Sequence, residues 1–208
     1  MNEDNVFGLH SEQYDEWFTD NHHLFDAEAE AIRQVLPAAG QGIEIGTGTG
    51  LFASRLGIRN GVEPSAKMAA KAAARGIQMI DAYAENLPIG DNTYDYALMV
   101  TVDCFLQDVL KSFQEIRRIL RAGGSFIIAF IDKATPLGRI YEAHKATSLF
   151  YRNARFHTSE EIGELLKTAG FKAEEARQTI FTLENHPQEI RDGTGEGVFA
   201  VIKAIRIE

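Results

Sequence analysis

The feature that most constrains the fold of this chain is a short apolar segment that leads directly into a turn with three alternating glycines. The sequence over residues 42–50 is Gly-Ile-Glu-Ile-Gly-Thr-Gly-Thr-Gly, and a helical pattern begins at Leu51. Glycine has no Cβ atom, so the backbone of this turn can approach a ligand closely. The N–H groups that open the following helix can donate hydrogen bonds to an anionic group of that ligand. The pattern therefore predicts a strand–turn–helix unit that binds a nucleotide-like cofactor.

The spacing of the glycines indicates which cofactor fits. The dinucleotide fingerprint G-x-G-x-x-G requires a third glycine where this chain has Leu51. An acidic residue, Glu44, stands two positions before Gly46, and its carboxylate would repel a pyrophosphate and attract a cation. S-adenosylmethionine (SAM) has a carboxylate for the helix N-terminus, and an ammonium and a sulfonium for an acidic rim. The pattern thus favours SAM over NAD. A turn without any ligand is the weaker alternative, because three alternating glycines are costly in chain entropy.

Length, charge and cysteine content limit the class of protein. The 208 residues are enough for one domain with a large core, and 45% of them are hydrophobic. The net charge of −9 argues against nucleic acid or an anionic membrane as the main partner. The longest apolar run, residues 126–131, is too short to span a bilayer, and residues 1–5 lack the features of a signal peptide. Cys104 is the single cysteine, so we expect a cytoplasmic protein without disulfides.

Strand-like and helix-like segments alternate after residue 40, which is typical of an α/β sheet with mainly parallel strands. Strands are expected at residues 42–46, 58–63, 77–81, 94–101, 125–131, 171–182 and 197–207. Helices are expected as a pair within 11–36, after a cap at Ser65, over 108–120, and from Thr158 to Gly170. No crossover helix separates the last two strands, so they should be antiparallel. The sequence predicts a Rossmann-like, doubly wound sheet of about seven strands, mostly parallel, with an antiparallel C-terminal strand and helices on both faces.

Residues 133–157 interrupt the alternation with a cluster of aromatic and basic side chains. The cluster consists of Tyr141, His144, Phe150, Tyr151, Arg152, Arg155, Phe156 and His157. The segment follows the fifth strand and would lie above the carboxyl ends of the strands, where open α/β sheets bind ligands. It is either a helical insertion over the active site or a flap that only packs over the core. We expect residues 1–40 to form an N-terminal helical lid, and residues 1–208 to form a single domain.

Five motifs, taken in order, resemble those of the class I SAM-dependent methyltransferases, particularly the type 11 group that acts on small molecules. They are Glu-Ile-Gly-Thr-Gly-Thr-Gly at 44–50, Gly-Val-Glu-Pro-Ser at 61–65, Asp-Ala-Tyr-Ala-Glu-Asn-Leu-Pro at 81–88, Tyr-Asp-Tyr-Ala at 94–97 and Leu-Arg-Ala-Gly-Gly at 120–124. The resemblance extends from about Tyr14 to the C-terminus. It implies transfer of a methyl group from SAM to a small-molecule acceptor, with S-adenosylhomocysteine as the product. The family usually has proline where this chain has Ala122, and alanine can stay helical, so the preceding helix should run slightly longer.

The resemblance also implies contacts with the methionine and ribose parts of the cofactor. Gly46, Thr47 and Gly48 would surround the methionine part, with Glu44 near its ammonium. Glu63 would accept hydrogen bonds from both ribose hydroxyls, as a carboxylate at a strand end can.

Contacts with the adenine are implied for the ends of the second and third strands. Pro64 and Ser65 would border the ring, Asp81 would accept a hydrogen bond from its amino group, and Ala82 would donate a backbone N–H to it. The remaining implied contacts, with the sulfonium and from the lid, are Thr101, Val102 and Tyr14.

The acceptor side is less specified, and no residue is assigned as catalytic. The candidates are Tyr14, Trp17, His22, His23, Asp103, His144, Tyr151, Arg155 and His157. No metal is expected, because His22 and His23 would point apart on a helix and lack a set of partner ligands. Amine, carboxylate, hydroxyl, thiol and carbon nucleophiles all suit the fold. Arg152 and Arg155 favour a flat or anionic acceptor. Two alternatives stay open, an NAD(P)-dependent oxidoreductase and a non-catalytic SAM-binding protein.

Overall fold

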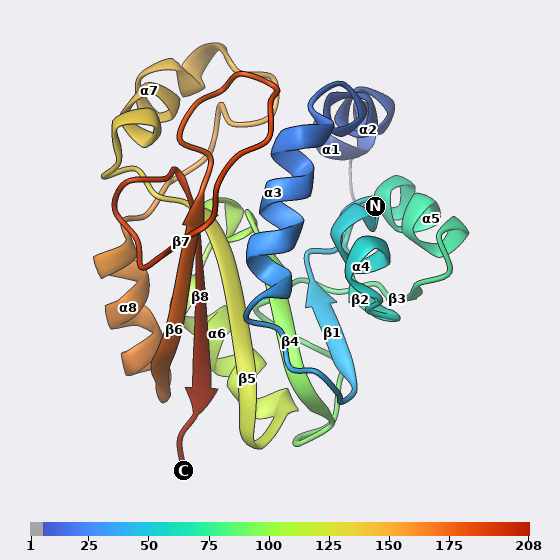
Figure 1. Cartoon of the computed structure of the whole chain (residues 1–208). Coiled ribbons are helices and arrows are strands. Elements are labelled where there is room, and N and C mark those ends of the chain that lie inside the picture. Colours follow the sequence, from blue (N-terminus) through green and yellow to red (C-terminus); the bar gives the residue numbers. More distant parts are fainter. Residues whose placement is uncertain (1–5) are drawn as a thin grey trace.

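A mostly parallel sheet organises the chain (Figure 1), and the computed structural model describes residues 6–208. Within these residues the sheet has eight strands in the order β3-β2-β1-β4-β5-β8-β6-β7. The strands are β1 Gly42–Ile45, β2 Asn60–Val62, β3 Gln78–Ile80, β4 Tyr94–Val100, β5 Leu120–Ile131, β6 Phe171–Thr179, β7 Arg191–Asp192 and β8 Phe199–Arg206. The pairs from β3 to β5 are parallel, and β8 runs antiparallel to both β5 and β6. The predicted fold class is confirmed, and the two-residue β7 adds one strand to the expected number.

Helices cover both faces of this sheet. They are α1 Val6–Leu9, α2 Ser11–Asp20, α3 His22–Arg33, α4 Leu51–Leu56, α5 Ala66–Ala74, α6 Val109–Ile119, α7 Pro136–His144 and α8 Ser159–Thr168, with short 3-10 turns η1 Asp103–Phe105 and η2 Lys145–Thr147. Leu98 of β4 packs in the same core as Ile32 of α3, and its neighbour Met99 packs on the other face with Phe113 of α6. Because consecutive strand residues point to opposite faces and both faces are buried, the central strands are apolar without interruption.

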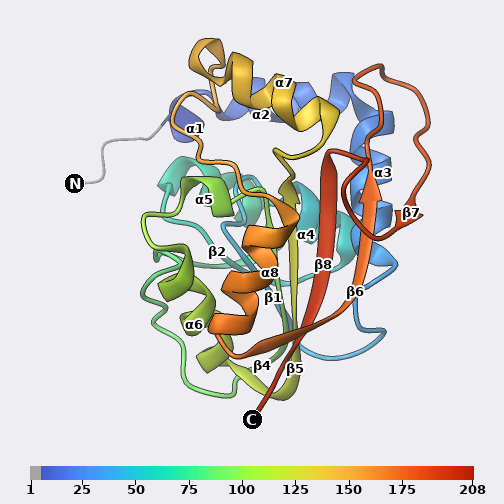
Figure 2. The same ribbon diagram turned by 90° about the vertical axis from the view of Figure 1, so that its left-hand side faces the viewer.

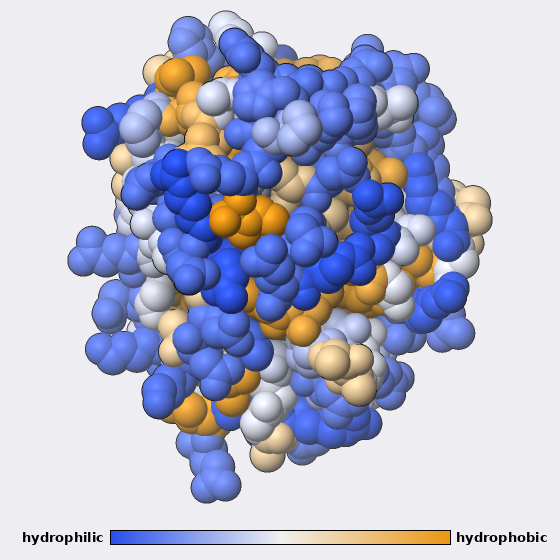
Figure 3. Space-filling model, in the orientation of Figure 1, coloured by the Kyte–Doolittle hydropathy of each residue, from blue (hydrophilic) through white to orange (hydrophobic). Residues whose placement is uncertain are grey.

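Three of these helices, α1, α2 and α7, lie over one end of the sheet (Figure 2). Figure 2 shows α1, α2 and α7 together above the end where the parallel strands finish. Helix α7 and η2 lie within the segment 133–157, and α1 to α3 form most of the described part of the segment 1–40. The expectations for residues 1–5, including the missing signal peptide, lie outside the described residues. The face of the molecule in Figure 3 is mostly hydrophilic with small apolar patches, and the buried apolar side chains form two cores, one on each side of the sheet.

Helix α6 ends earlier than expected. The sequence predicted that it would run through Leu120 and that Ala122 would extend it. The structure contradicts this, because α6 ends at Ile119 and Leu120 pairs with Tyr94 at the start of β4. Strand β5 therefore begins at Leu120 and contains Gly123 and Gly124, which were expected to precede it. Burial of Leu120 and pairing with β4 outweigh the high helix propensity of Ala122, because tertiary contacts contribute more than local propensity does.

The predicted helix starts are confirmed. Ser65 accepts a hydrogen bond from the Met68 N–H, and Asp108 accepts one from the Lys111 N–H. Thr158 and Glu161 form a complete capping box at the start of α8. In the part of the chain from residue 6 onward, none of the helices combines the length and the apolar character that crossing a bilayer would require. The cytoplasmic location stays a prediction.

Replacing Thr158 with alanine should lower the free energy of unfolding by about 1 kcal/mol, because the Glu161 N–H loses its acceptor at the start of α8. Chemical denaturation of both proteins measures this difference. Thr168→Ala is the matched control, because the Thr168 hydroxyl donates to Glu164 O within the same helix and does not cap it. Equal losses in the two variants would contradict a specific capping role for Thr158.

Candidate functional site

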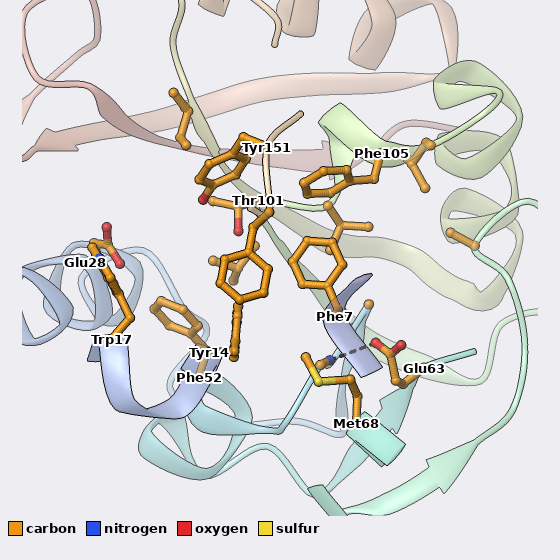
Figure 4. A pocket seen from close by; sticks show the side chains of 18 of the residues that line it. Phe7, Tyr14, Trp17, Glu28, Phe52, Glu63, Met68, Thr101, Phe105 and Tyr151 are labelled. Carbon is orange, nitrogen blue, oxygen red and sulfur yellow. Dashed lines mark hydrogen bonds between the residues drawn. The ribbon is translucent and has the colours of Figure 1, made fainter. Parts of the chain in front are cut away.

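A cavity of about 740 Å³ lies above the carboxyl ends of the parallel strands. This volume is within the range of roughly 300–1,000 Å³ that is common for small-molecule sites. Its floor is formed by the ends of β1, β2 and β4, and its walls by α1, α2, α3, α7 and the segment after η2. Figure 4 shows aromatic rings across the middle of this space, among them Phe7, Tyr14, Phe105 and Tyr151.

The glycine turn between β1 and α4 forms one side of the cavity. The N–H groups of Gly46 and Thr47 both donate to Val62 O of β2, at 2.8 and 2.9 Å, which ties the turn to the neighbouring strand. Gly46 and Gly48 have positive φ angles of 74° and 57° and line the cavity. The Thr47 hydroxyl donates to Glu44 O at 2.9 Å, so this side chain faces the protein interior. The predicted close backbone approach therefore concerns the two glycines, and Thr47 lies outside the lining.

Glu63 follows β2 and presents its carboxylate to the same space. Its Oε2 accepts a hydrogen bond from the Gly48 N–H at 2.9 Å, drawn as a dashed line in Figure 4, and its Oε1 accepts one from the Ser65 N–H at 2.9 Å. Burial raises the pKa of this carboxyl above its usual value, and the two backbone donors lower it. Each oxygen retains one further lone pair, so the carboxylate can accept two more hydrogen bonds.

Two further acids lie in or beside the cavity. Glu44 of β1 is buried under the glycine turn, where its Oε2 accepts from the Ala53 N–H at 3.1 Å. Glu28 of α3 lines the cavity itself. Burial raises the pKa of each to about 8. Among residues 6–208, no lysine, arginine or histidine forms an ion pair with Glu28, Glu44 or Glu63, and none lines the cavity. Three acids without a basic partner favour a positively charged ligand over an anionic one, because a cation beside them would stabilise their charged forms.

Two β-branched residues of the lining have an unusual backbone. Thr101, directly after β4, has a φ of 51°, and Ile180, directly after β6, has a φ of 61°. β-branched residues rarely adopt positive φ. The Thr101 N–H donates to Ala129 O at 2.7 Å and the Ile180 carbonyl accepts from Val198 N–H at 3.0 Å, so neighbouring strands hold both in place. Such conformations cluster at ligand sites, where the surrounding structure maintains the strain.

The structure brings most of the predicted cofactor residues together. Those that line the cavity are Tyr14, Gly46, Gly48, Glu63, Pro64, Ala82, Thr101 and Val102. Glu44 and Thr47 lie beneath the turn, and Ser65 caps α5. Asp81 is exposed in the loop after β3 and does not line the cavity. The roles of all twelve residues in cofactor binding stay predictions.

The acceptor-side candidates divide differently. Tyr14, Trp17 and Tyr151 line the cavity. The candidates outside the lining are His22, His23, Asp103, His144, Arg155 and His157. Asp103 is buried and its Oδ2 lies 2.7 Å from His157 Nδ1, so this pair joins η1 to the segment before α8. The charged residues of the described lining are Glu28, Glu63 and Glu85, so the lining gives no support to an anionic acceptor, and the class of the acceptor stays a prediction.

Sequence reasoning missed Glu28 and several rings. The missed aromatic residues that line the cavity include Phe7, Phe18, Phe52 and Phe105. A signal for Glu28 was available, because it stands four residues after Leu24 and four before Ile32, both buried. Residues spaced by four share one face of a helix, so this acid had to face the interior.

Comparisons with known proteins agree with this geometry. The family model described as "Methyltransferase domain" matches residues 43–128. An uncharacterized protein of Methanocaldococcus jannaschii is 42% identical over 205 residues, which is 98% of this chain and 100% of that protein. A crystal structure from Thermotoga maritima, described as a SAM-dependent methyltransferase and possible histamine N-methyltransferase, has a TM-score of 0.92 and 40% identity, covering 97% of this chain and 98% of that one. Geranyl diphosphate C-methyltransferase from Streptomyces coelicolor A3(2) shares the fold, with a TM-score of 0.68, 18% identity, and 89% and 80% of the two chains covered.

Proposed function

This chain belongs to the class I SAM-dependent methyltransferases, and from that premise we propose that it methylates a small molecule bound in the cavity above the sheet. SAM is its cofactor, and when bound it supplies an electrophilic methyl group on a positively charged sulfur. The observation that carries the acceptor part of the proposal is the cavity itself. It extends from Gly46, Gly48 and Glu63 at the strand ends to aromatic side chains of α2 and α7. An acidic and aromatic lining suits a small molecule better than nucleic acid.

The proposal gives the twelve predicted residues two kinds of role. Residues of the lining would touch the cofactor directly, with Glu63 accepting hydrogen bonds from two hydroxyls through its free lone pairs. Glu44 would act from beneath the turn, where its buried carboxylate favours a cationic group nearby. Asp81 and Ser65 do not line the cavity, so their proposed contacts with the adenine would have to come from positions next to the lining.

The chain's own contribution to the reaction is to bind, orient and exclude water. Holding two reactants in line can remove roughly 7–11 kcal/mol from the barrier. The positive φ angles of Thr101 and Ile180, which hydrogen bonds to neighbouring residues maintain, support a site that is already formed before the ligands bind. We propose that residues 1–40 and 133–157 act as lids over this site and that the whole chain is a single domain. Tyr14 and Trp17 of α2, and Tyr141 of α7, are among the lid side chains of the lining.

The first test is calorimetric titration with SAM, S-adenosylhomocysteine and NAD in parallel, followed by turnover of acceptors of different nucleophile classes. We expect binding of the two adenosyl ligands without NAD, and turnover with at least one acceptor class. The description of the T. maritima relative makes amines one class to include. Binding without turnover of any class would favour the non-catalytic SAM-binding alternative. Binding of NAD alone would contradict the proposal.

Replacing Glu63 with alanine should weaken SAM binding by roughly 1.5–3 kcal/mol, about 10- to 150-fold, because hydrogen bonds to a charged acceptor are lost. Calorimetry on variants with native circular dichroism measures the affinity. Glu16→Ala is the control, since Glu16 is an exposed acid on α2 and its loss changes the net charge equally. Unchanged affinity in the folded Glu63 variant would contradict its contact with the cofactor.

A further inference from the structure

A carboxylate lies among aromatic rings at the part of the cavity that is remote from Glu63. Figure 4 shows Glu28 and Glu63 on opposite sides of the view, with the rings of Tyr14, Phe7 and Phe105 between them. Residues that line this space beside Glu28 come from α2, α4 and α7. Glu63 and the glycine turn, which would hold the cofactor, form the opposite side, and in Figure 4 Tyr14 lies between the two sides, so Glu28 is left for a second ligand.

Three tyrosines lie within electrostatic reach of Glu28. Burial raises the pKa of Tyr141 to about 12, and the negative charge of Glu28 adds to this effect. Burial likewise raises the pKa of Tyr14 and of Tyr151, and Glu28 contributes to both shifts. These tyrosines come from α2, from α7 and from the segment after η2, and all three line the cavity. Rings from separate segments therefore surround one carboxylate.

Glu28 has no partner of its own in the described chain. Across residues 6–208, no hydrogen bond or ion pair to its carboxylate is formed, and no basic side chain lines the cavity. The helix fixes this arrangement, because Leu24 and Ile32 on the same face are buried. Burial raises the pKa of Glu28 to about 8, so the ligand-free site holds mostly the neutral acid near pH 7, and a cationic ligand would favour the charged carboxylate.

We propose that Glu28 and the surrounding rings recognise a basic nitrogen of the methyl acceptor, which makes the acceptor an amine with a flat or apolar body. This inference rests on the proposed function, since it assigns the second ligand of the same cavity. The protonated nitrogen would pair with the Glu28 carboxylate, and the faces of the neighbouring rings would attract the same charge. Glu28 is then a residue that determines specificity.

The experiment compares 2-phenylethylamine with 2-phenylethanol, which has nearly the same size and no charge at pH 7.5. Each is titrated by calorimetry into the protein with and without saturating S-adenosylhomocysteine, so that no turnover is needed. We expect the wild type to bind the amine at least about tenfold more tightly than the alcohol. Glu28→Gln, which keeps the shape and removes the charge, should abolish this preference and leave alcohol binding unchanged. Glu30→Gln is the matched control, because Glu30 is exposed on the same helix.

The outcomes separate this inference from the proposed function. Equal binding of amine and alcohol, or a preference that survives in Glu28→Gln, would overturn the inference. A loss of SAM affinity in Glu28→Gln as large as the loss of amine affinity would also overturn it, because Glu28 would then serve the cofactor. Failure of the wild type to bind SAM would instead contradict the proposed function, and the amine preference measured without S-adenosylhomocysteine would still test Glu28.

Discussion

Replacing Gly46 with alanine is expected to weaken SAM binding by about 100-fold or more and to lower the free energy of unfolding by about 3 kcal/mol. The φ of Gly46 is 74°, a conformation that costs other residues roughly 1–2 kcal/mol. A Cβ atom there would also lie 2.3 Å from Val102 Cγ2, far inside normal contact. The turn cannot move aside freely, because the Gly46 and Thr47 N–H groups are bonded to Val62 O. Val102 lines the cavity, so its displacement would alter the site directly.

Gly57→Ala separates the effect of a positive φ angle from the effect of the clash with Val102. Gly57 ends α4 with a φ of 76°, and a Cβ atom there would meet nothing within 4 Å. This variant should lose only about 1–2 kcal/mol of stability and keep its affinity for SAM. Denaturation and calorimetry on both variants provide the comparison. If the two variants behaved alike, the close packing of Gly46 against Val102 would have no part in cofactor binding.

Replacing Glu44 with glutamine is expected to stabilise the ligand-free protein and to weaken SAM binding. Burial raises the pKa of Glu44 to about 8, with a further contribution from the charge of Glu63 and an opposing one from the Ala53 N–H. The folded state therefore binds this proton more tightly than the unfolded state. Its stabilising contribution is complete below about pH 4.5 and is lost as the pH rises through about 8. Glutamine does not titrate, so the variant should gain roughly 2–4 kcal/mol over wild type at pH 9.

Urea denaturation at pH 6 and pH 9 measures this effect. The advantage of Glu44→Gln should be about 2 kcal/mol larger at pH 9 than at pH 6, since most of the proton release occurs between them. In the presence of saturating SAM the wild type should be more stable than Glu44→Gln, because a cation beside the buried carboxylate makes its charged form favourable. Glu16→Gln, at an exposed position, should show no such pH dependence. A constant difference between wild type and Glu44→Gln across this range would contradict the account of Glu44.

Local patterns were enough to predict the elements and the glycine turn. Strand alternation, the caps at Ser65 and Thr158, and the antiparallel last pair are all found in the structure. These features depend on residues within a few positions of one another or on the burial period of one element. The predicted helix end at Leu120 was wrong because it depends on a residue far away in the sequence. Leu120 pairs with Tyr94, 26 residues earlier, and this pairing makes it the start of β5.

The acceptor half of the site could not be predicted in this way. The sequence suggested Arg152 and Arg155, yet the lining contains Glu28 and rings from α1, α2, α4 and α7. His157 was a candidate for the acceptor side, and the structure pairs it with the buried Asp103, 54 positions away and outside the lining. Helical spacing shows that Glu28 faces inward, but it contains no information on which segments meet it there.

Short-range spacing and backbone freedom encode the α/β fold and the SAM-type turn, and they place the acid Glu63 at the end of a strand, so these features could be read from the sequence. The meeting of Glu28, Tyr14, Tyr141 and Tyr151 in one cavity, whose described lining contains no basic residue, is a result of the tertiary structure. The physical reason is that the charge and shape of a cavity depend on segments far apart in the chain. Their meeting is fixed by the packing of both cores.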